Sequence, residues 1–227
     1  MTQFTATHIA ACIEHTLLKP NVSETEIVRL CDEAQMNGFL AVCVNPYWVT
    51  TAVAHLKGSP VKVVTVAGFP LGANEPEIKI RESLFAAERG ATEIDVVANI
   101  GLLVSGHLAQ AEEELEELRR QLPASVGLKV IIESSLLTTE LQMDAVRMAI
   151  NSGAQFVKSG TGFQGPVTVE QIQVMTMAAH GEILIKASGG IRTAHQCQQL
   201  IGAGASRIGT SSGVEIMRDL GNFSHKE

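Results

Sequence analysis

The feature that most constrains the fold of this chain is a unit that recurs along its length: a short apolar run, a loop, a helical stretch and a glycine. Alternation of strands with helices predicts a parallel sheet with right-handed crossovers. Eight runs are expected to form strands: 13–18, 40–44, 61–67, 93–98, 128–132, 156–158, 183–187 and 207–209. Eight units in 227 residues favour closure into an α/β TIM (β/α)8 barrel. A doubly wound open sheet is the alternative.

The chain reads as a single domain over residues 1–227, because no low-complexity tract or Pro/Gly-rich linker interrupts it. We expect a short lead-in before about residue 12 and a tail after about residue 220. Capping boxes, in which Ser or Thr precedes Glu or Gln by three residues, predict helix starts. They pair Ser23 with Glu26, Thr139 with Gln142, Thr168 with Gln171, and Thr193 with Gln196. Left-handed caps are expected where a glycine precedes a strand, at Gly38, Gly90, Gly153 and Gly204.

Composition excludes several classes of protein. Apolar residues make up 45% of the chain but aromatic residues only 4%, so the core must be aliphatic. A net charge of −7 argues against a nucleic-acid surface, which would be basic. Four cysteines without a C-x-x-C pair indicate reduced thiols and no zinc site. No signal peptide or membrane span is recognisable, so we expect a cytoplasmic protein without membrane partners.

Two glycine-rich loops follow the last two strands, in the segments KASGGIR and GTSSG. TIM barrels often bind phosphate at these two loops, because glycines let backbone N–H groups approach an anion. The expected contacts are Gly189, Gly190, Gly209, Ser211 and Ser212. The alternative is ordinary turn chemistry, in which Gly and Ser are common.

Lysines occur at unusual places in the predicted strands. Lys158 and Lys186 end buried apolar runs, at the face where barrel enzymes keep their catalytic residues. Lys62 and Lys129 are expected at strand starts, on the opposite face, and are assigned no chemistry. Lys79 is expected on a solvated helix face. Buried lysines are rare without a partner or a purpose, so Lys158 and Lys186 are candidate functional residues.

Adjacent strands should bring Lys158 and Lys186 together, so that burial and mutual repulsion lower both pKa values. Such effects can bring a lysine into the nucleophilic range of about 7–8. The alternative, stronger for Lys186, is that each lysine grips a substrate phosphate. Asp95, inside an apolar run, should point into the barrel, where it serves as a proton relay or as a structural ion-pair partner.

The motifs of this chain resemble those of the deoxyribose-phosphate aldolase family. The resemblance runs from about residue 13 to 213, through IEHTLLKP, VCVNP, GFPLGAN, EIDVVANIG, FVKSGTGF, KASGGIRT and GTSSG in the family's order. It implies a TIM-barrel class I aldolase that needs neither metal nor cofactor and is often a homodimer. It also implies the substrate, 2-deoxy-D-ribose 5-phosphate, and the products, acetaldehyde and D-glyceraldehyde 3-phosphate.

The resemblance assigns roles to residues. Lys158 matches the Schiff-base lysine, Lys186 the second lysine that tunes it, and Asp95 the acid of the proton relay. Phosphate-binding segments match at Thr161, Gly162, Gly189, Gly190, Gly209, Ser211 and Ser212. Glu14, Thr16 and Cys43 are possible residues on the substrate side. Cys43 is expected first as a small core residue, with reaction toward unsaturated aldehydes as a minor alternative.

The chain departs from the family pattern at three points. Glu14 stands where the family usually has Asp, which can shift a polar contact near the open sugar. Gly160 replaces a Ser, which removes a possible hydroxyl donor. A C-terminal Tyr that serves some members as a late proton donor is missing, since the chain has one tyrosine, Tyr47. Two other functions are alternatives to the aldolase: a sugar-phosphate isomerase on the same barrel, and a non-catalytic phosphosugar-binding barrel.

Overall fold

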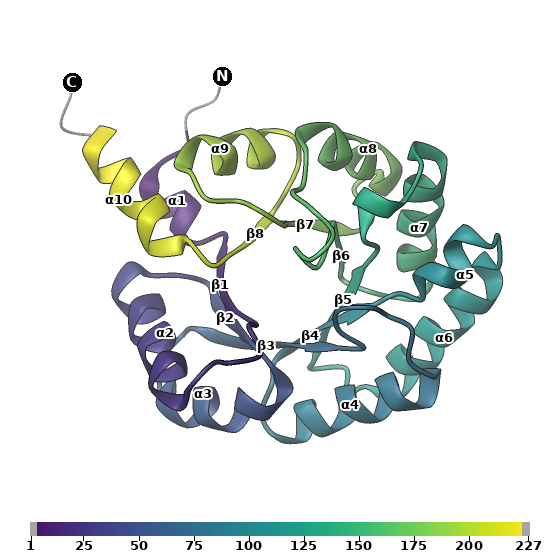
Figure 1. The fold of residues 1–227 in the computed structure, drawn as a ribbon, viewed down its shortest axis with the longest axis horizontal. Helices are drawn as coiled ribbons and strands as arrows, with labels where there is room; N and C mark the ends of the chain where they lie inside the picture. Colours follow the sequence, from purple (N-terminus) through teal and green to yellow (C-terminus); the bar gives the residue numbers. More distant parts are fainter. Residues whose placement is uncertain (1–3, 224–227) are drawn as a thin grey trace.

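The computed structural model describes residues 4–223 and shows a closed barrel of eight parallel strands in sequence order (Figure 1). The strands are β1 Ile13–Leu17, β2 Ala41–Val44, β3 Lys62–Ala67, β4 Glu93–Val97, β5 Gly127–Ile131, β6 Phe156–Lys158, β7 Leu184–Ser188 and β8 Arg207–Thr210. The ladder closes because β1 pairs with both β2 and β8. The predicted TIM barrel is confirmed, and the open sheet is wrong.

Helices surround the barrel as an outer ring (Figure 1). They are α1 Ala6–Ala10, α2 Glu24–Asn37, α3 Val49–His55, α4 Pro76–Glu88, α5 Ile100–Val104, α6 Leu108–Gln121, α7 Thr139–Asn151, α8 Val169–Ala179, α9 Ala194–Gly202 and α10 Gly213–Phe223. Short 3-10 turns are η1 Pro46–Trp48 and η2 Ser134–Leu136. The expected lead-in contains α1, which packs beside α10. Part of the expected tail, residues 224–227, lies outside the described residues.

Three of the four predicted capping boxes form, at Ser23, Thr168 and Thr193. The fourth is wrong by one residue. Thr138 caps α7 by accepting a hydrogen bond from the Leu141 N–H at 3.3 Å. Gln142 is buried instead and donates to the carbonyls of Ser134 and Leu137. The four glycines expected before strands all adopt positive φ, which an L side chain rarely tolerates.

The apolar core lies mainly between the barrel and the helices. A second, separate cluster sits inside the barrel and consists of Ala41, Cys43, Val64 and Val66 from β2 and β3. The barrel interior beside β4 to β8 and β1 is occupied by charged side chains instead, which is unusual for a position shielded from water. Among the helices of residues 4–223, none is long and apolar enough to cross a membrane.

Lys79 of α4 is fully buried, so its expected place on a solvated face is wrong. Its ammonium donates to Glu114 Oε1 on α6 at 2.6 Å and to the Val97 carbonyl at 3.0 Å. Ser83 and Ala86 share the buried face at helical spacing, and small residues there leave room for the long side chain. Burial lowers the pKa of Lys79, and the hydrogen bond to Glu114 opposes that effect.

Candidate active site

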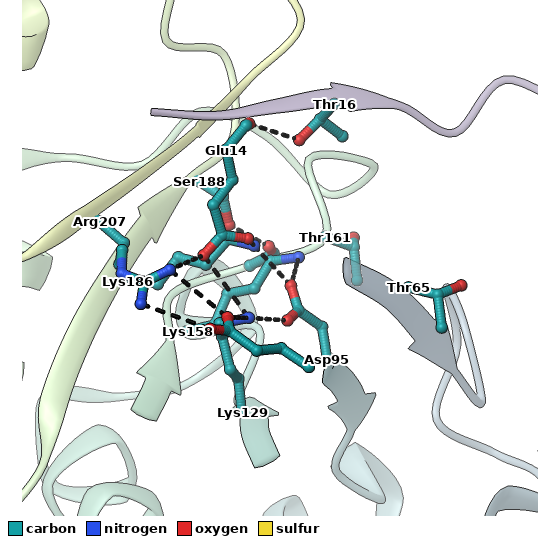
Figure 2. A network of polar contacts seen from close by, with 12 residues as sticks. Glu14, Thr16, Thr65, Asp95, Lys129, Lys158, Thr161, Lys186, Ser188 and Arg207 are labelled. Atoms are coloured by element: carbon teal, nitrogen blue, oxygen red, sulfur yellow. Dashed lines mark hydrogen bonds and ion pairs between the residues drawn. The ribbon is translucent and has the colours of Figure 1, made fainter. Parts of the chain in front are cut away.

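Lys158 and Lys186 lie side by side in the barrel interior (Figure 2). Lys158 ends β6, and the parallel register places it opposite Lys186 of β7. Both are almost completely buried, at 3% and 0% exposure. The predicted proximity of the two lysines is therefore confirmed.

Asp95 of β4 points at both lysines from across the barrel (Figure 2). Its Oδ2 accepts hydrogen bonds from Lys158 Nζ at 2.9 Å and from Lys186 Nζ at 2.6 Å. Its Oδ1 accepts one from Lys129 Nζ at 3.0 Å. Burial alone would raise the pKa of Asp95, but the three ammonium groups hold it well below its usual range. One carboxylate is thus shared by three lysines.

Lys129 does not lie on the N-terminal face, and that expectation is wrong. It is the third residue of β5, fully buried in the interior, and its ammonium lies 2.5 Å from a carboxylate oxygen of Glu93. The strand register pairs Lys129 with Asp95. This register depends on the shear of the closed barrel, which a single run of sequence does not reveal. Lys62 does sit at a strand start, where its half-exposed side chain pairs with Glu93 at 2.7 Å.

Glu14 contributes a further carboxylate to the site from β1, the strand that closes the barrel against β8. Its carboxylate is fully buried and pairs with Lys186, with Lys129 at 3.5 Å and with Arg207 at 3.3 Å. The longer side chain therefore reaches down into the charged interior. We call the ionic cluster the set Glu14, Glu93, Asp95, Lys129, Lys158, Lys186 and Arg207.

The pKa of Lys186 runs against the expectation from sequence. Burial disfavours its charge, but the carboxylates of Asp95 and Glu14 outweigh that effect and raise the pKa of Lys186. The pKa of Lys129 is raised for the same reason. The neighbouring lysine can be predicted from the adjacent strands, whereas the second carboxylate cannot, because Glu14 comes from the opposite end of the chain. The two carboxylates therefore favour the charged form of Lys186.

A cavity of about 370 Å³ opens above the ionic cluster at the carboxyl ends of the strands. Among its lining residues are the predicted Lys158, Thr16, Thr161, Gly162, Gly189, Gly190, Gly209 and Ser211. Lys19 and Arg192 add two cations to the lining. Ser212 is not in the lining, and its N–H donates to Thr210 Oγ1 at 2.9 Å. The glycine-rich loops and one lysine of the cluster therefore share one cavity.

The cavity wall offers unused backbone donors. Within residues 4–223, the N–H groups of Gly162, Gly189, Gly190 and Ser211 make no hydrogen bond to the protein. Gly190 needs to be glycine, since φ is +67° and a Cβ would lie 2.9 Å from Pro166 Cβ. Unpaired N–H groups from neighbouring loops form the kind of concave surface that binds an anion.

Two residues on the substrate side differ in their surroundings. Thr16 lines the cavity, and its hydroxyl donates to the Glu14 carbonyl at 2.9 Å. Cys43 is fully buried in the apolar cluster of β2 and β3 and is not among the lining residues of the cavity. Burial raises the pKa of the Cys43 thiol to about 11, only partly opposed by the Lys186 ammonium. A thiol in these surroundings is a poor nucleophile.

The closed barrel, with a lysine–carboxylate cluster that opens into a cavity at the carboxyl end of its strands, defines a TIM-barrel enzyme of the aldolase class. A family model described as DeoC/LacD family aldolase matches residues 8–219. The chain belongs to this DeoC/LacD aldolase family.

Individual relatives cover nearly the whole chain. A protein of Thermoanaerobacter sp. (strain X514), named deoxyribose-phosphate aldolase, is 45% identical over 93% of this chain and 96% of its own length. Among solved structures, one titled "QR15, an Aldolase" is 39% identical with a TM-score of 0.91, covering 96% of this chain and 99% of that one. A deoxyribose phosphate aldolase from Aeropyrum pernix, described as tetrameric, is 28% identical with a TM-score of 0.88, covering 96% and 93%.

Proposed function

We propose that this chain is a class I aldolase that cleaves 2-deoxy-D-ribose 5-phosphate, reversibly, to D-glyceraldehyde 3-phosphate and acetaldehyde through a Schiff base on Lys158. One observation carries the assignment of the nucleophile. Of the three lysines that contact Asp95 in the described part of the chain, Lys158 alone also lines the cavity. The family membership and the names of the relatives support the reaction.

The ionic cluster contains more cations than carboxylates. The cluster contains three carboxylates and four cations, and Lys62 adds a charge only at the half-exposed strand start. Attack on a carbonyl requires Lys158 as a free amine, and in that form the cluster contains three cations and three anions. Asp95 and Glu14 favour the charged form of Lys186, which lies beside the reacting nitrogen.

The phosphate is the orienting group in this proposal. It binds the free N–H groups of Gly162, Gly189, Gly190 and Ser211, with the Lys19 and Arg192 side chains nearby. Holding one end of the open-chain sugar places its aldehyde carbon at Lys158, which removes much of the entropic cost of the encounter.

The steps follow from these positions. The Lys158 amine adds to the aldehyde, and loss of water gives a protonated imine. The C3 hydroxyl loses its proton, the C2–C3 electron pair moves into the imine to give an enamine, and glyceraldehyde 3-phosphate leaves. Protonation at C2 and hydrolysis then release acetaldehyde. Because its pKa is held low, the Asp95 carboxylate acts by orienting a water that carries these protons.

Assembly and compartment are further proposals. We propose a homodimer on the basis of the family resemblance, while the Aeropyrum pernix relative is described as tetrameric. Four buried cysteines without disulfides are consistent with the cytoplasm. Tyr47 does not line the cavity, so we propose that water supplies the proton that a tyrosine supplies in some family members.

The test is reductive trapping. The protein is incubated with 2-deoxyribose 5-phosphate and sodium borohydride, which reduces an imine to a stable amine, and the peptides are weighed. An adduct on the Lys158 peptide, absent in Lys158→Ala, is expected. An adduct on Lys186 would reverse the roles of the two lysines. No adduct under turnover conditions would contradict the Schiff base and favour the isomerase or the non-catalytic barrel.

A further inference from the structure

Glu133 is a buried carboxylate that the mechanism above does not use. It lies two residues after the end of β5 and is 3% exposed. Its φ of 48° places it in the left-handed region, which is uncommon for a residue with a side chain. No lysine, arginine or histidine pairs with it among residues 4–223. An unpaired buried carboxylate on a strained backbone points to a specific use.

The partner of Glu133 is the loop that carries the nucleophile and the phosphate donors. Both donors of Thr161 end on this carboxylate: the N–H lies 3.1 Å from Oε2, and the hydroxyl lies 2.5 Å from the same atom. Thr161 Oγ1 accepts in turn from the Phe163 N–H at 3.1 Å. The Thr161 hydroxyl hydrogen is therefore already committed and is not free for a substrate phosphate.

Gly160 makes this contact possible. A Cβ at residue 160 would lie 2.6 Å from Glu133 Oε1, so the missing side chain leaves the space that the carboxylate fills. The backbones are joined as well, since the Ser134 N–H donates to the Ser159 carbonyl at 2.7 Å and the Ile132 N–H to that of Lys158 at 3.0 Å. Glu133 itself is not among the residues that line the cavity.

We propose that Glu133 is a positioning residue for phosphate recognition: through Thr161 it fixes the segment after Lys158 so that the Gly162 N–H faces the cavity. This inference rests on the proposed function and deepens it. It changes the role of Thr161, which supports the phosphate site through its contact with Glu133 and not through its own hydroxyl.

Electrostatics alone predicts the opposite change in phosphate affinity when the Glu133 charge is removed, so the experiment distinguishes the two explanations. Removing a negative charge close to an anion site should strengthen anion binding. If Glu133 acts by holding the loop, Glu133→Gln must weaken phosphate binding, because the neutral amide oxygen of glutamine accepts from Thr161 more weakly than a charged carboxylate oxygen does.

The experiment compares Glu133→Gln with Glu140→Gln, the same change at an exposed carboxylate of α7. Three quantities are measured: the inhibition constant of inorganic phosphate, the KM for 2-deoxyribose 5-phosphate, and borohydride trapping of acetaldehyde, which carries no phosphate. For Glu133→Gln we expect the inhibition constant and the KM to rise about tenfold, with trapping on Lys158 within twofold of the unaltered protein. Glu140→Gln should change none of the three.

Thr161 variants provide a second route to the same answer. Thr161→Val should weaken phosphate binding more than Thr161→Ser. Adding Glu133→Gln to Thr161→Val should cost less than Glu133→Gln alone, because the hydroxyl contact is already lost and only the contact of the Thr161 N–H remains. Constants unchanged within twofold, or tighter phosphate binding in Glu133→Gln, would overturn the inference. If the unaltered protein traps no acetaldehyde, the proposed function fails instead, and direct binding of inorganic phosphate to the same variants still decides the role of Glu133.

Discussion

Two buried lysines, Lys79 and Lys158, make the molecule's most instructive comparison. Each is at most 3% exposed, and each ammonium lies within 2.9 Å of a carboxylate. Lys79 sits outside the barrel, where it has Glu114 to itself and also donates to a backbone carbonyl. Lys158 sits inside the barrel, shares Asp95 with two other lysines and faces a cavity.

The difference shows that burial of a lysine does not by itself indicate chemistry. Lys79 and Glu114 form a one-to-one ion pair between two helices, so the loss of either charge leaves the other buried without a partner. The interior cluster has more cations than carboxylates, and Asp95 has ammonium partners in Lys129 and Lys186 besides Lys158. Surplus charge and access to a cavity, taken together, separate a reactive lysine from a structural one.

The largest expected effect is on the structural lysine. Lys79→Met should lower the free energy of unfolding by about 3–5 kcal/mol, because Glu114 is left charged and buried without a partner. Urea unfolding measures it. The control is Lys79→Met with Glu114→Leu, which should recover most of the loss. Equal losses in the single and double variants would mean that the volume of the side chains matters here and the charge does not.

A smaller effect concerns the pH dependence of the ionic cluster. Burial would raise the pKa of Glu93, but Lys129, with Lys62, brings it down to about 2 from an ordinary value of 4.5. The unfolded chain then binds the proton first as pH falls. The resulting stabilisation, about 3 kcal/mol, is complete above about pH 4.5 and is lost between there and about pH 2.

Unfolding of Glu93→Gln between pH 6 and pH 2 checks this figure. The variant should show a correspondingly weaker loss of stability than the unaltered protein over that range, whereas Glu88→Gln, a change at an exposed residue of α4, should follow the unaltered protein. Identical pH profiles for all three proteins would show that Glu93 is not held ionised by Lys129.

The smallest effect is expected at the reactive lysine. Lys158→Met should change the free energy of unfolding by less than about 1 kcal/mol, although it abolishes imine formation. Asp95 keeps two ammonium partners, and the cluster becomes balanced. Chemical denaturation measures the stability, and borohydride trapping verifies the loss of the imine. A loss as large as that of Lys79→Met would remove the distinction between the two lysines.

Much of this could be predicted from sequence. The repeating unit predicted eight strands and their closure, and closure placed Lys158 beside Lys186 with Asp95 facing them. Patterns of this kind involve residues that are close in sequence, so they can be recognised without knowing which distant segments are in contact.

What sequence could not predict depends on contacts across the chain. The inward direction of Lys129 depends on the stagger of the strands, and the burial of Lys79 on which side of α4 meets α6. The spacing of Lys79 with Ser83 and Ala86 was an available signal. Glu133 gave none, because its role follows from a left-handed backbone and a missing side chain at Gly160.

The closure of β1 against β8 also has a consequence for how the enzyme is made. Glu14 lies near the start of the chain, and its partners Lys186 and Arg207 are separated from it by 172 and 193 residues. A ribosome therefore completes Lys158 and its loop before Arg207 exists. The growing chain therefore carries Lys158, the proposed nucleophile, before the charges around it are assembled. We expect imine chemistry only after β8 has been synthesised and has paired with β1.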